Sequence, residues 1–396
     1  TELPVIIFLS FRYPFLHNYT ASTVFDFLWK EKNAWIIKGD FSSFFDTLNH
    51  QLLLKTVKQV LLGDVDLKLQ DDWYSILKFV TKYRTISKKE IDALYKPFHG
   101  KTYVDNRKKL GNYIKTGKLH LSSTNNKGIP QGTAISAVLA NVYMIFFDEY
   151  VDRLVKSYGG FYRRYSDDFV IILPESKCDY ACVNEIKSRI ISKSENELFL
   201  DIETKKTKLL HFVKGERKIY KNNTSTATTF DYLGFEFNGK TVFLRSKTLY
   251  KFHYRGKKGI ILLARNLEER TIVESDHYPR LRKKYLLRRI KSKHIEKIKE
   301  GLDCAKKDSE AGQSIKGRRK ATIMYLSSKP RKMKNMLNYA VNAQKVFSIP
   351  ISGCDSLYYV NIEKKIKKQI GFFQREFNKL KKKHNKELQE INVNVK

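Results

Sequence analysis

Apolar positions in the first part of the chain predict a strand followed by a turn and a helix. Residues 34–54, AWIIKGDFSSFFDTLNHQLLL, contain an apolar run that ends at Asp40 and a helical pattern from Leu48 that continues to Val57. Asp46 precedes that pattern. It is interpreted either as the N-cap of the helix, which aspartate favours, or as a residue with a chemical role.

The middle of the chain predicts further helices and one hairpin. Residues 64–127 are polar, aromatic and mostly helical in pattern, and residues 128–151 begin as a Gly/Pro loop that becomes a helix. The apolar face expected for that helix consists of Ile135, Val138, Leu139, Val142 and Phe146. Residues 161–173, FYRRYSDDFVIIL, predict two strands around Asp167 and Asp168. Alternation along the first strand places Arg163 and Arg164 on opposite faces.

The next segments alternate between helix and strand. Residues 180–199 predict an amphipathic helix, and residues 201–212 predict a turn that leads into a strand. Residues 228–245 predict a hairpin with Asn238-Gly239 at its turn, since Asn-Gly is typical of two-residue hairpin loops.

From about residue 262 the chain becomes helical and basic. One helix face would carry Ile295, Ile298, Leu302 and Ala305, and residues 312–320 form a basic connector. Residues 358–390 place an apolar stripe on one helix face, and this stripe either packs on the same protein or forms an oligomer contact. The stripe consists of Ile362, Ile366, Ile370, Phe373, Phe377 and Leu380. Strands that carry carboxylates, followed by helices, predict an α+β fold.

Composition indicates a large core and a polyanionic partner. The chain has 396 residues, 42% of them hydrophobic, which predicts more than one subdomain. Its formal net charge is +35, and residues 251–396 hold 38 basic against 14 acidic side chains. Nucleic acid is therefore the first partner expected, and a membrane surface is the second. Because we find no stretch of about 18 apolar residues, we expect no membrane-spanning helix.

The cysteines and the first residues of the chain indicate the cellular compartment in which the protein is expected. Cys178, Cys182, Cys304 and Cys354 form no paired CxxC set, so they are expected to be reduced thiols in a cytoplasmic protein without structural zinc. Residue 1 is Thr and no signal-peptide pattern follows, so the chain either starts inside a domain or lacks earlier residues.

The carboxylates Asp40, Asp167 and Asp168 predict a metal site. If their strands are neighbours in one antiparallel sheet, about 4.8 Å apart, the three side chains converge and need positive charge to stay ionised. Mg²⁺ supplies it and prefers one or two carboxylates together with substrate phosphates. Two ions about 3.5–4 Å apart can hold the attacking and leaving oxygens of a phosphoryl transfer.

Five segments in order give the sequence its closest family resemblance. They are GDFSSFFD (39–46), GIPQGTAIS (128–136), YSDD (165–168), KKT (205–207) and YLGF (232–235). Over roughly residues 15–245 the chain resembles a reverse transcriptase, which implies a right-hand α+β polymerase with an antiparallel palm sheet. The implied division is partial fingers (1–38), palm with the first motif (39–62), a fingers/palm insertion (63–127), palm (128–245), and a basic helical thumb with C-terminal helices (246–396).

The resemblance implies roles at the reaction centre. Asp40, the carbonyl of Phe41, Asp167 and Asp168 would hold two Mg²⁺ ions, or Mn²⁺ in their place, with Asp167 bridging both ions and Asp168 more peripheral. Lys206 is our choice for the lysine near the pyrophosphate, acting as a general acid. Lys205 and Lys208 are alternatives, and all three are compatible with solvated side chains.

Further roles concern the nucleotide and the primer. Phe45 would close against a ribose 2′-OH and select dNTPs, or it simply packs with Phe44 in the core. Gln131 would contact the incoming nucleotide and the template base, while Pro130 and Gly132 shape its loop. The primer contacts implied by the resemblance are Tyr165 at the primer end and the turn of Tyr232, Leu233 and Gly234. We have no account of Ser166.

The chain departs from the family pattern before its first motif. Only Arg12 is an arginine among the residues that precede Asp40, so the basic fingers segment is reduced or lies before residue 1. We see no RNase H, integrase or HNH motif, which argues against retroviral and mobile-intron contexts.

The pattern GIPQGTAISAVLANVYM most resembles bacterial defence-associated and abortive-infection reverse transcriptases. This implies copying of a bound non-coding RNA into cDNA from dNTPs, in phage defence, with no membrane partner and the oligomeric state open. The alternatives are a protein-primed or template-independent DNA polymerase, an RNA-binding scaffold with a non-essential palm, and an RNA-dependent RNA polymerase.

Overall fold

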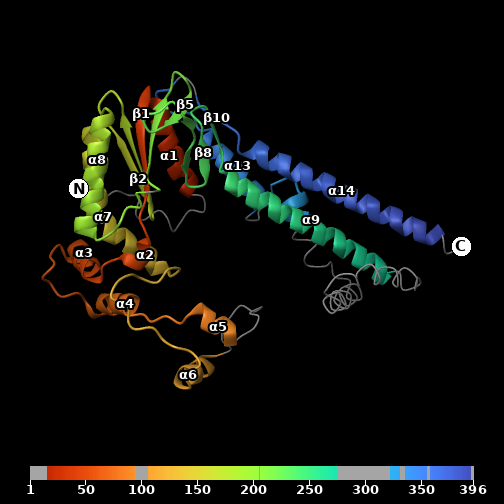
Figure 1. The fold of residues 1–396 in the computed structure, drawn as a ribbon, viewed down its shortest axis with the longest axis horizontal. Helices are drawn as coiled ribbons and strands as arrows, with labels where there is room; N and C mark the ends of the chain where they lie inside the picture. Colours follow the sequence, from red (N-terminus) through yellow and green to blue (C-terminus); the bar gives the residue numbers. More distant parts are fainter. Residues whose placement is uncertain are drawn as a thin grey trace. The chain divides into compact units, whose positions relative to one another are not determined.

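The structure, a computed structural model, describes residues 16–94, 106–204, 206–274, 322–330, 335–354 and 357–393 (Figure 1). The described chain divides into two compact units. The first spans residues 31–227, and the second combines residues 16–30 with residues from 228 onward. More than one subdomain was expected, and this is confirmed. Which stretches act as fingers, palm and thumb stays a prediction.

A six-stranded sheet organises the first unit, in the order β2-β3-β1-β4-β5-β6. Its strands are β1 (Asn33–Asp40), β2 (Phe161–Tyr165), β3 (Asp168–Pro174), β4 (Lys208–Val213), β5 (Lys218–Lys221) and β6 (Ala227–Thr228). The central strand β1 pairs antiparallel with both β3 and β4. The expected antiparallel pairing of the Asp40 strand with the Asp167 hairpin is therefore confirmed.

Two helices, α7 (Ala134–Ser157) and α8 (Tyr180–Lys193), share a hydrophobic core with one face of this sheet. That face presents alternate residues of β1 and β3, among them Trp35, Ile37 and Ile171, which are almost fully buried. Each large side chain buried in this way contributes roughly 1.5–3 kcal/mol. Because side chains alternate along a strand, Lys38 and Asp40 lie on the other face.

Helix α7 differs from its predicted face at one position. Leu139 is buried as expected, but Phe146 is 48% exposed and the neighbouring Phe147 is 3% exposed. The prediction for Phe146 is wrong because Phe147 packs against Phe41 of the core. By length and composition, α7 alone among the described helices could cross a membrane, so the expectation of no such stretch is not met. Its buried side chains give it the role of a core helix.

Shorter helices complete the first unit. They are α2 (Phe44–Thr47), α3 (His50–Leu62), α4 (Asp71–Thr81), α5 (Lys88–Leu94), α6 (Arg107–Lys115) and the π-helix η3 (Ser194–Leu198). The prediction that residues 64–127 are mostly helical holds for their described part. Asn49 caps α3 by accepting from the backbone N–H groups of Gln51 and Leu52, whereas Asp46 lies inside α2. The N-cap interpretation of Asp46 is therefore wrong.

Cys178 and Cys182 form a disulfide, so the expectation of reduced thiols is wrong for this pair. The backbone explains their proximity. Asp179 caps α8 by accepting from the N–H of Cys182, which folds the first turn of the helix back and brings the two Cα atoms to 5.4 Å. Cys354 is a free thiol, and Cys304 lies outside the described residues.

The second unit is built around a four-stranded sheet, in the order β10-β9-β8-β7. Its elements are α1 (Leu16–Lys30), β7 (Phe230–Tyr232), β8 (Phe235–Phe237), β9 (Thr241–Leu244), α13 (Met336–Phe347) and β10 (Tyr359–Val360). Phe25 of α1 contacts the rings of Phe230, Phe237 and Phe347, which places α1 in this core. The predicted hairpin with its turn at Asn238-Gly239 is confirmed as β8 and β9.

Two long helices, α9 (Ser246–Glu274) and α14 (Glu363–Val393), run side by side in this unit (Figure 1). A short π-helix, η4 (Thr322–Leu326), packs beside them. The residues of the predicted α14 stripe from Ile362 to Phe373 are completely buried, so packing on the same protein is confirmed there. An oligomer contact stays a prediction. The expected face from Ile295 to Ala305 and the connector 312–320 lie outside the described residues.

Candidate functional site

The three aspartates meet where β1 ends. Asp40 is the direct partner of Asp168 across the β1–β3 pair. The backbone N–H of Phe41 donates to the carbonyl oxygen of Asp167 over 3.2 Å. Asp40 and Asp168, which are 128 positions apart in the sequence, are thus neighbours on adjacent strands, where Cα atoms stand about 4.5–5.5 Å apart.

A two-residue turn carries Asp167. Tyr165 pairs with Asp168, so Ser166 and Asp167 alone link β2 to β3. Ser166 has a φ of 58°, in the left-handed region. That conformation directs the chain back over two residues and leaves Asp167 at the tip of the hairpin, which gives the structural role of Ser166 that the sequence did not reveal.

Arg164 anchors this turn to α7. Its guanidinium, 4% exposed, forms a bidentate ion pair with Asp148, at 2.6 Å from Nη2 to Oδ2 and 2.9 Å from Nε to Oδ1. It also donates from Nη1 to the carbonyl oxygen of Ser166 over 2.8 Å. Tyr162, on the same strand face, donates to Asp148 as well. Arg163 lies on the other face over the ring of Phe161, so the predicted alternation is confirmed.

Gly39 makes room for an aromatic ring beside Asp40. It pairs with Phe169 across the sheet, and a Cβ atom built on Gly39 would stand 2.2 Å from the Phe169 ring. The ring therefore crosses β1 at the position of the glycine and reaches Phe41, at 5.5 Å between centroids. The Phe169 ring therefore packs against Gly39 and Phe41, the residues on either side of Asp40.

Lys206 is the lysine that reaches Asp40. Its Nζ stands 3.4 Å from Asp40 Oδ2 and 2.5 Å from Glu203 Oε2. The hydrogen bond that Lys206 donates to Glu203, and then its contact with Asp40, raise the pKa of Lys206 above its ordinary value. Lys208 pairs with Lys38 across β1 and β4 on the face that carries Asp40. Lys205 lies outside the described residues.

The glycine-proline loop is held against the segment that follows β1. The N–H of Ile129 donates to the carbonyl oxygen of Phe45, and the N–H of Gly128 donates to that of Leu48, each over 2.8 Å. Gly128 has a φ of 82°, and a Cβ there would lie 2.6 Å from the backbone oxygen of Asp46. Only glycine permits both the conformation and the approach.

His50 is a further support that the sequence reasoning missed. Its Nε2 stands 2.6 Å from the carbonyl oxygen of Gly128, so the ring nitrogen donates to the loop. Ser136 donates to the carbonyl oxygen of Pro130 from the start of α7. Pro130 is therefore tied from the helix side, while Gln131 and Gly132 are exposed.

Phe45 lies beside this loop with its ring half-buried. It packs edge-on against Phe44, at 5.3 Å between centroids, and borders the hydrophobic core. The aromatic-pair interpretation therefore describes the packing of Phe45, while its action against a ribose 2′-OH stays a prediction.

Tyr232, Leu233 and Gly234 belong to the second unit, where Leu233 and Gly234 form the turn from β7 to β8 with φ values of 45° and 90°. Tyr232 is buried, so the surface of this turn is formed by Leu233 and Gly234 and by the backbone. A contact with a primer stays a prediction for all three residues.

The donor set at the end of β1 fits a hard divalent cation by its chemistry. Carboxylates of Asp40, Asp167 and Asp168 and the carbonyl of Phe41 are the oxygen ligands that Mg²⁺ prefers. Within the part of the chain that the structure describes, no group of three or more His, Cys, Asp or Glu side chains is arranged to hold a metal ion. The Asp40 carboxylate contacts Lys206 instead. The metal roles of these residues stay predictions.

The order of these elements defines a polymerase domain of one class. The family described as reverse transcriptase (RNA-dependent DNA polymerase) matches residues 8–237, and the chain belongs to this family. The match includes the three aspartates, the glycine-proline loop and the turn at Gly234. The predicted α+β polymerase fold is confirmed.

Individual relatives are distant. Protein YkfC of Escherichia coli (strain K12) is 24% identical over 213 residues, which cover 46% of this chain and 45% of YkfC. The chain thus spans less than half the length of that relative.

Among solved structures, the chain is similar to truncated apo telomerase from Candida tropicalis (14% identity, TM-score 0.38, 56% of this chain and 38% of that one). Telomerase from Candida albicans in complex with a TWJ fragment of telomeric RNA has 15% identity and a TM-score of 0.33, covering 87% and 54% of the two chains.

Proposed function

We propose that the protein is an RNA-directed DNA polymerase that adds dNTPs by phosphoryl transfer with two metal ions. The observation that carries this proposal is the pairing of Asp40 with Asp168, with Asp167 bonded to the backbone of Phe41, in a chain of the reverse transcriptase family. Carboxylates on neighbouring strands repel one another, so the backbone proximity of Asp40, Asp167 and Asp168 favours a function that brings cations to them.

Asp40, Asp167, Asp168 and the Phe41 carbonyl would hold Mg²⁺ or Mn²⁺. When bound, the ions supply the positive charge that favours ionisation of a primer 3′-hydroxyl and stabilises the leaving pyrophosphate. Lys206, like any lysine with its ordinary pKa, is protonated at neutral pH, and Glu203 and Asp40 raise that pKa further. It therefore holds at Nζ a proton that a departing pyrophosphate oxygen can accept.

The other residues of the site would orient substrate. Phe45 would exclude a ribose 2′-OH, and Gln131 would contact the nucleotide from the loop that Pro130 and Gly132 shape. Tyr165, exposed at the end of β2, would lie against the primer end. The turn from Tyr232 to Gly234 would steady the primer backbone.

The proposed template is a dedicated non-coding RNA, and the proposed context is bacterial antiphage defence in the cytoplasm. The formal charge of +35 supports a polyanionic partner. The defence context is supported by the resemblance of residues 128–144 to defence-associated enzymes. The cDNA product and the dNTPs complete the proposed set of partners.

DNA synthesis by the purified protein and its co-purified RNA tests the site. Wild type is compared with D167N/D168N and with D152N, a matched control on the α7 surface where Asp152 pairs with Lys156. We expect labelled dNTP incorporation in wild type and D152N, and none in the double variant. DNA made by D167N/D168N would show that the site is wrong.

Four assays separate the alternative functions. Pre-treatment with RNase removes the product if RNA is the template. DNA that survives RNase and stays with protein in phenol would favour protein-primed synthesis, and incorporation of NTPs would favour an RNA polymerase. Phage plating on cells with D167N/D168N tests the defence role, since unchanged protection would favour a scaffold without a required polymerase.

A further inference from the structure

Close packing against α14 and η4 fixes the rotation of helix α9 about its own axis. Gly256 and Gly259 face α14 and η4, where a Cβ atom on Gly256 would stand 2.0 Å from the Phe373 ring and one on Gly259 would stand 2.8 Å from Tyr325. Phe252 lies on the same face, with its ring 5.6 Å from that of Phe373. The helix cannot turn without a clash, so its opposite face remains exposed.

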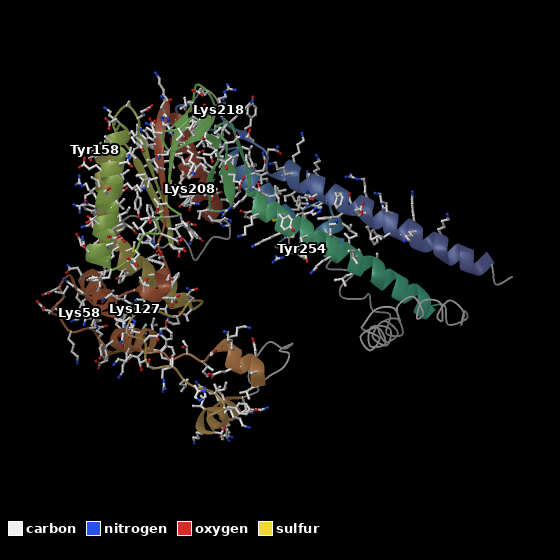
Figure 2. All side chains as sticks on the ribbon, in the orientation of Figure 1. Lys58, Lys127, Tyr158, Lys208, Lys218 and Tyr254 are labelled. Atoms are coloured by element: carbon white, nitrogen blue, oxygen red, sulfur yellow. A yellow bond between two sulfur atoms is a disulfide. The ribbon has the colours of Figure 1, made fainter. Side chains whose placement is uncertain are left out.

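Two tyrosines occupy that exposed face. Each helical residue turns by about 100°, which places Tyr250 and Tyr254 opposite the glycine face. Tyr250 is 68% exposed and Tyr254 is 50% exposed. Their rings lie nearly parallel, with an interplanar angle of 13° and 6.5 Å between centroids. Lys258 Nζ lies 4.8 Å from the Tyr254 ring centroid, one turn further on. Figure 2 shows Tyr254 on α9.

The charged side chains that this stretch of α9 itself carries have a single sign, while Glu236 of β8 accepts from Ser246 at the start of the helix. Residues 246–266 contain no Asp or Glu. The exposed basic side chains of this stretch are Lys247, Lys251, Arg255, Lys257 and Lys258. Like charges one turn apart destabilise a helix, and no carboxylate within the stretch offsets them. An anionic partner would remove this repulsion.

We propose that this surface of α9 binds unpaired RNA, with bases stacked on Tyr250 and Tyr254 and phosphates held by the adjacent lysines. Open aromatic faces suit bases that are free to stack, whereas the bases of a duplex already stack on each other. The inference rests on the RNA partner of the proposed function, and on none of the residues at the reaction centre.

Binding to a single-stranded probe tests the proposal directly. The full chain with D167N/D168N, which removes synthesis, is titrated into fluorescein-labelled 15-nucleotide oligouridine RNA and into a 15-base-pair RNA–DNA duplex. Y250L/Y254L removes the aromatic faces and keeps apolar bulk. Y19L/Y359L is the matched control, since both of these tyrosines are exposed in the same unit.

We expect Y250L/Y254L to weaken oligouridine binding by about tenfold or more and duplex binding by less than about threefold, because stacking of single bases accounts for the loss. The control should stay within about twofold of its parent on both probes. An RNA with 2-aminopurine should lose its fluorescence quenching in Y250L/Y254L alone. Equal oligouridine affinity in the variant and its parent would overturn the proposal.

Two more results bear on the nature of the surface. K257Q/K258Q should reduce the slope of log Kd against log salt by about 0.7 for each single-strand phosphate that the variant no longer binds, while Y250L/Y254L should leave the slope unchanged. An equal loss of affinity on duplex and single strand would overturn the proposal, as would a change from dimer to monomer in light scattering of Y250L/Y254L. Failure here leaves DNA synthesis by the wild type unaffected, so the two proposals fail separately.

Discussion

Ser166 is the residue on which the geometry of the acidic turn depends. Its φ of 58° lies in the left-handed region, which costs an ordinary L-residue about 1–2 kcal/mol. A small side chain limits the clash that a β-branched one would add. The turn is thus conformationally strained and held by its surroundings, chiefly by the bond from Arg164 to the Ser166 carbonyl.

Substitutions at Ser166 should follow this strain. S166G is expected to raise the free energy of unfolding by up to about 1 kcal/mol and to keep DNA synthesis, because glycine adopts positive φ without a clash. S166V should lower stability by about 1–2 kcal/mol and reduce synthesis. Urea unfolding and dNTP incorporation measure both effects. A valine variant as stable as wild type would contradict the strained turn.

Arg164 should position the acidic turn rather than take part in the chemistry. R164K keeps the charge but loses the bidentate geometry with Asp148, so it should cost less than the roughly 3–5 kcal/mol of removing one partner of a buried ion pair. R164M/D148L is the sharper variant, since apolar residues replace the pair and stability should return except for the cost of the Tyr162 hydroxyl, which loses its acceptor. In this variant the Ser166 carbonyl still lacks the donor that Arg164 supplies, so the acidic turn is held less firmly. The Mg²⁺ concentration for half-maximal DNA synthesis should therefore rise. R163K, on the other strand face, is the control, and an unchanged Mg²⁺ dependence in R164M/D148L would refute the positioning role.

Sequence alone predicted the aspartates of the candidate site and missed the residues that support them. Asp40, Asp167 and Asp168 stand in short motifs, and their common place in one sheet followed from strand order. Arg164 is different because its partner Asp148 is on α7, and no local pattern joins an arginine to a distant carboxylate. The disulfide is local, between cysteines four residues apart, and it was missed because it depends on a helix cap at Asp179 that the sequence analysis did not assign.

Among the elements, the glycine-proline loop depends on α3. His50 in the first turn of α3 donates to Gly128 at one end of the loop, and Ser136 of α7 donates to Pro130 near its centre. The loop is therefore a bridge between two helices, with Gln131 exposed beside the second support.

Removing the His50 donor should weaken nucleotide binding. H50A is expected to raise KM for dNTPs several-fold and to change kcat less, because loosening the loop affects substrate positioning before it affects the carboxylates. H50Q should recover part of the loss, since its amide can donate to the same carbonyl. Steady-state kinetics provide the measurement, with H120A, an exposed histidine, as the control. A fall in kcat at constant KM would argue against this role.

Helix α1 contributes a half-buried carboxylate, that of Asp26, to the second unit. The Tyr358 hydroxyl donates to Asp26 over 2.7 Å, and burial raises the pKa of Asp26 above its ordinary value. When the pKa of a carboxyl group is higher in the folded state than in the unfolded state, the folded protein loses stability as the pH rises from the unfolded-state pKa through the folded-state pKa. The protein should therefore be more stable near pH 4 with respect to this group than at pH 7.

The variant D26N should remove this pH dependence. Asparagine still accepts from Tyr358 and carries no charge, so stability at pH 7 should rise relative to wild type, while the difference should shrink near pH 4. Chemical unfolding at both pH values measures the effect. Lower stability of D26N at pH 7 would show that the ionised form is favoured in the fold.

Element boundaries were predicted better than element partners. The strand at 208–213 and the hairpin turn at Asn238-Gly239 follow from local patterns. That α1 packs with strands more than 200 residues later does not, because an apolar helix face fits many partners equally well. The predicted apolar face of α7 was wrong at Phe146 because Phe146 and Phe147 are both apolar, and only packing against Phe41 distinguishes them.

At the scale of the whole molecule, the net charge of +35 should dominate the binding of nucleic acid. Contacts between lysines and phosphates release counterions, so affinity falls steeply with salt and depends little on sequence. A protein with six or more such contacts loses roughly a thousandfold in affinity between about 50 and 200 mM salt. We expect a loss of this order for RNAs of equal length and unrelated sequence, measured by titration at several salt concentrations. The slope of log affinity against log salt should be the same for D167N/D168N as for wild type, because the acidic residues would hold cations and not phosphates directly. A shallow slope, or one that differs between sequences, would mean that base contacts outweigh charge, and the excess of lysine and arginine would then need another explanation.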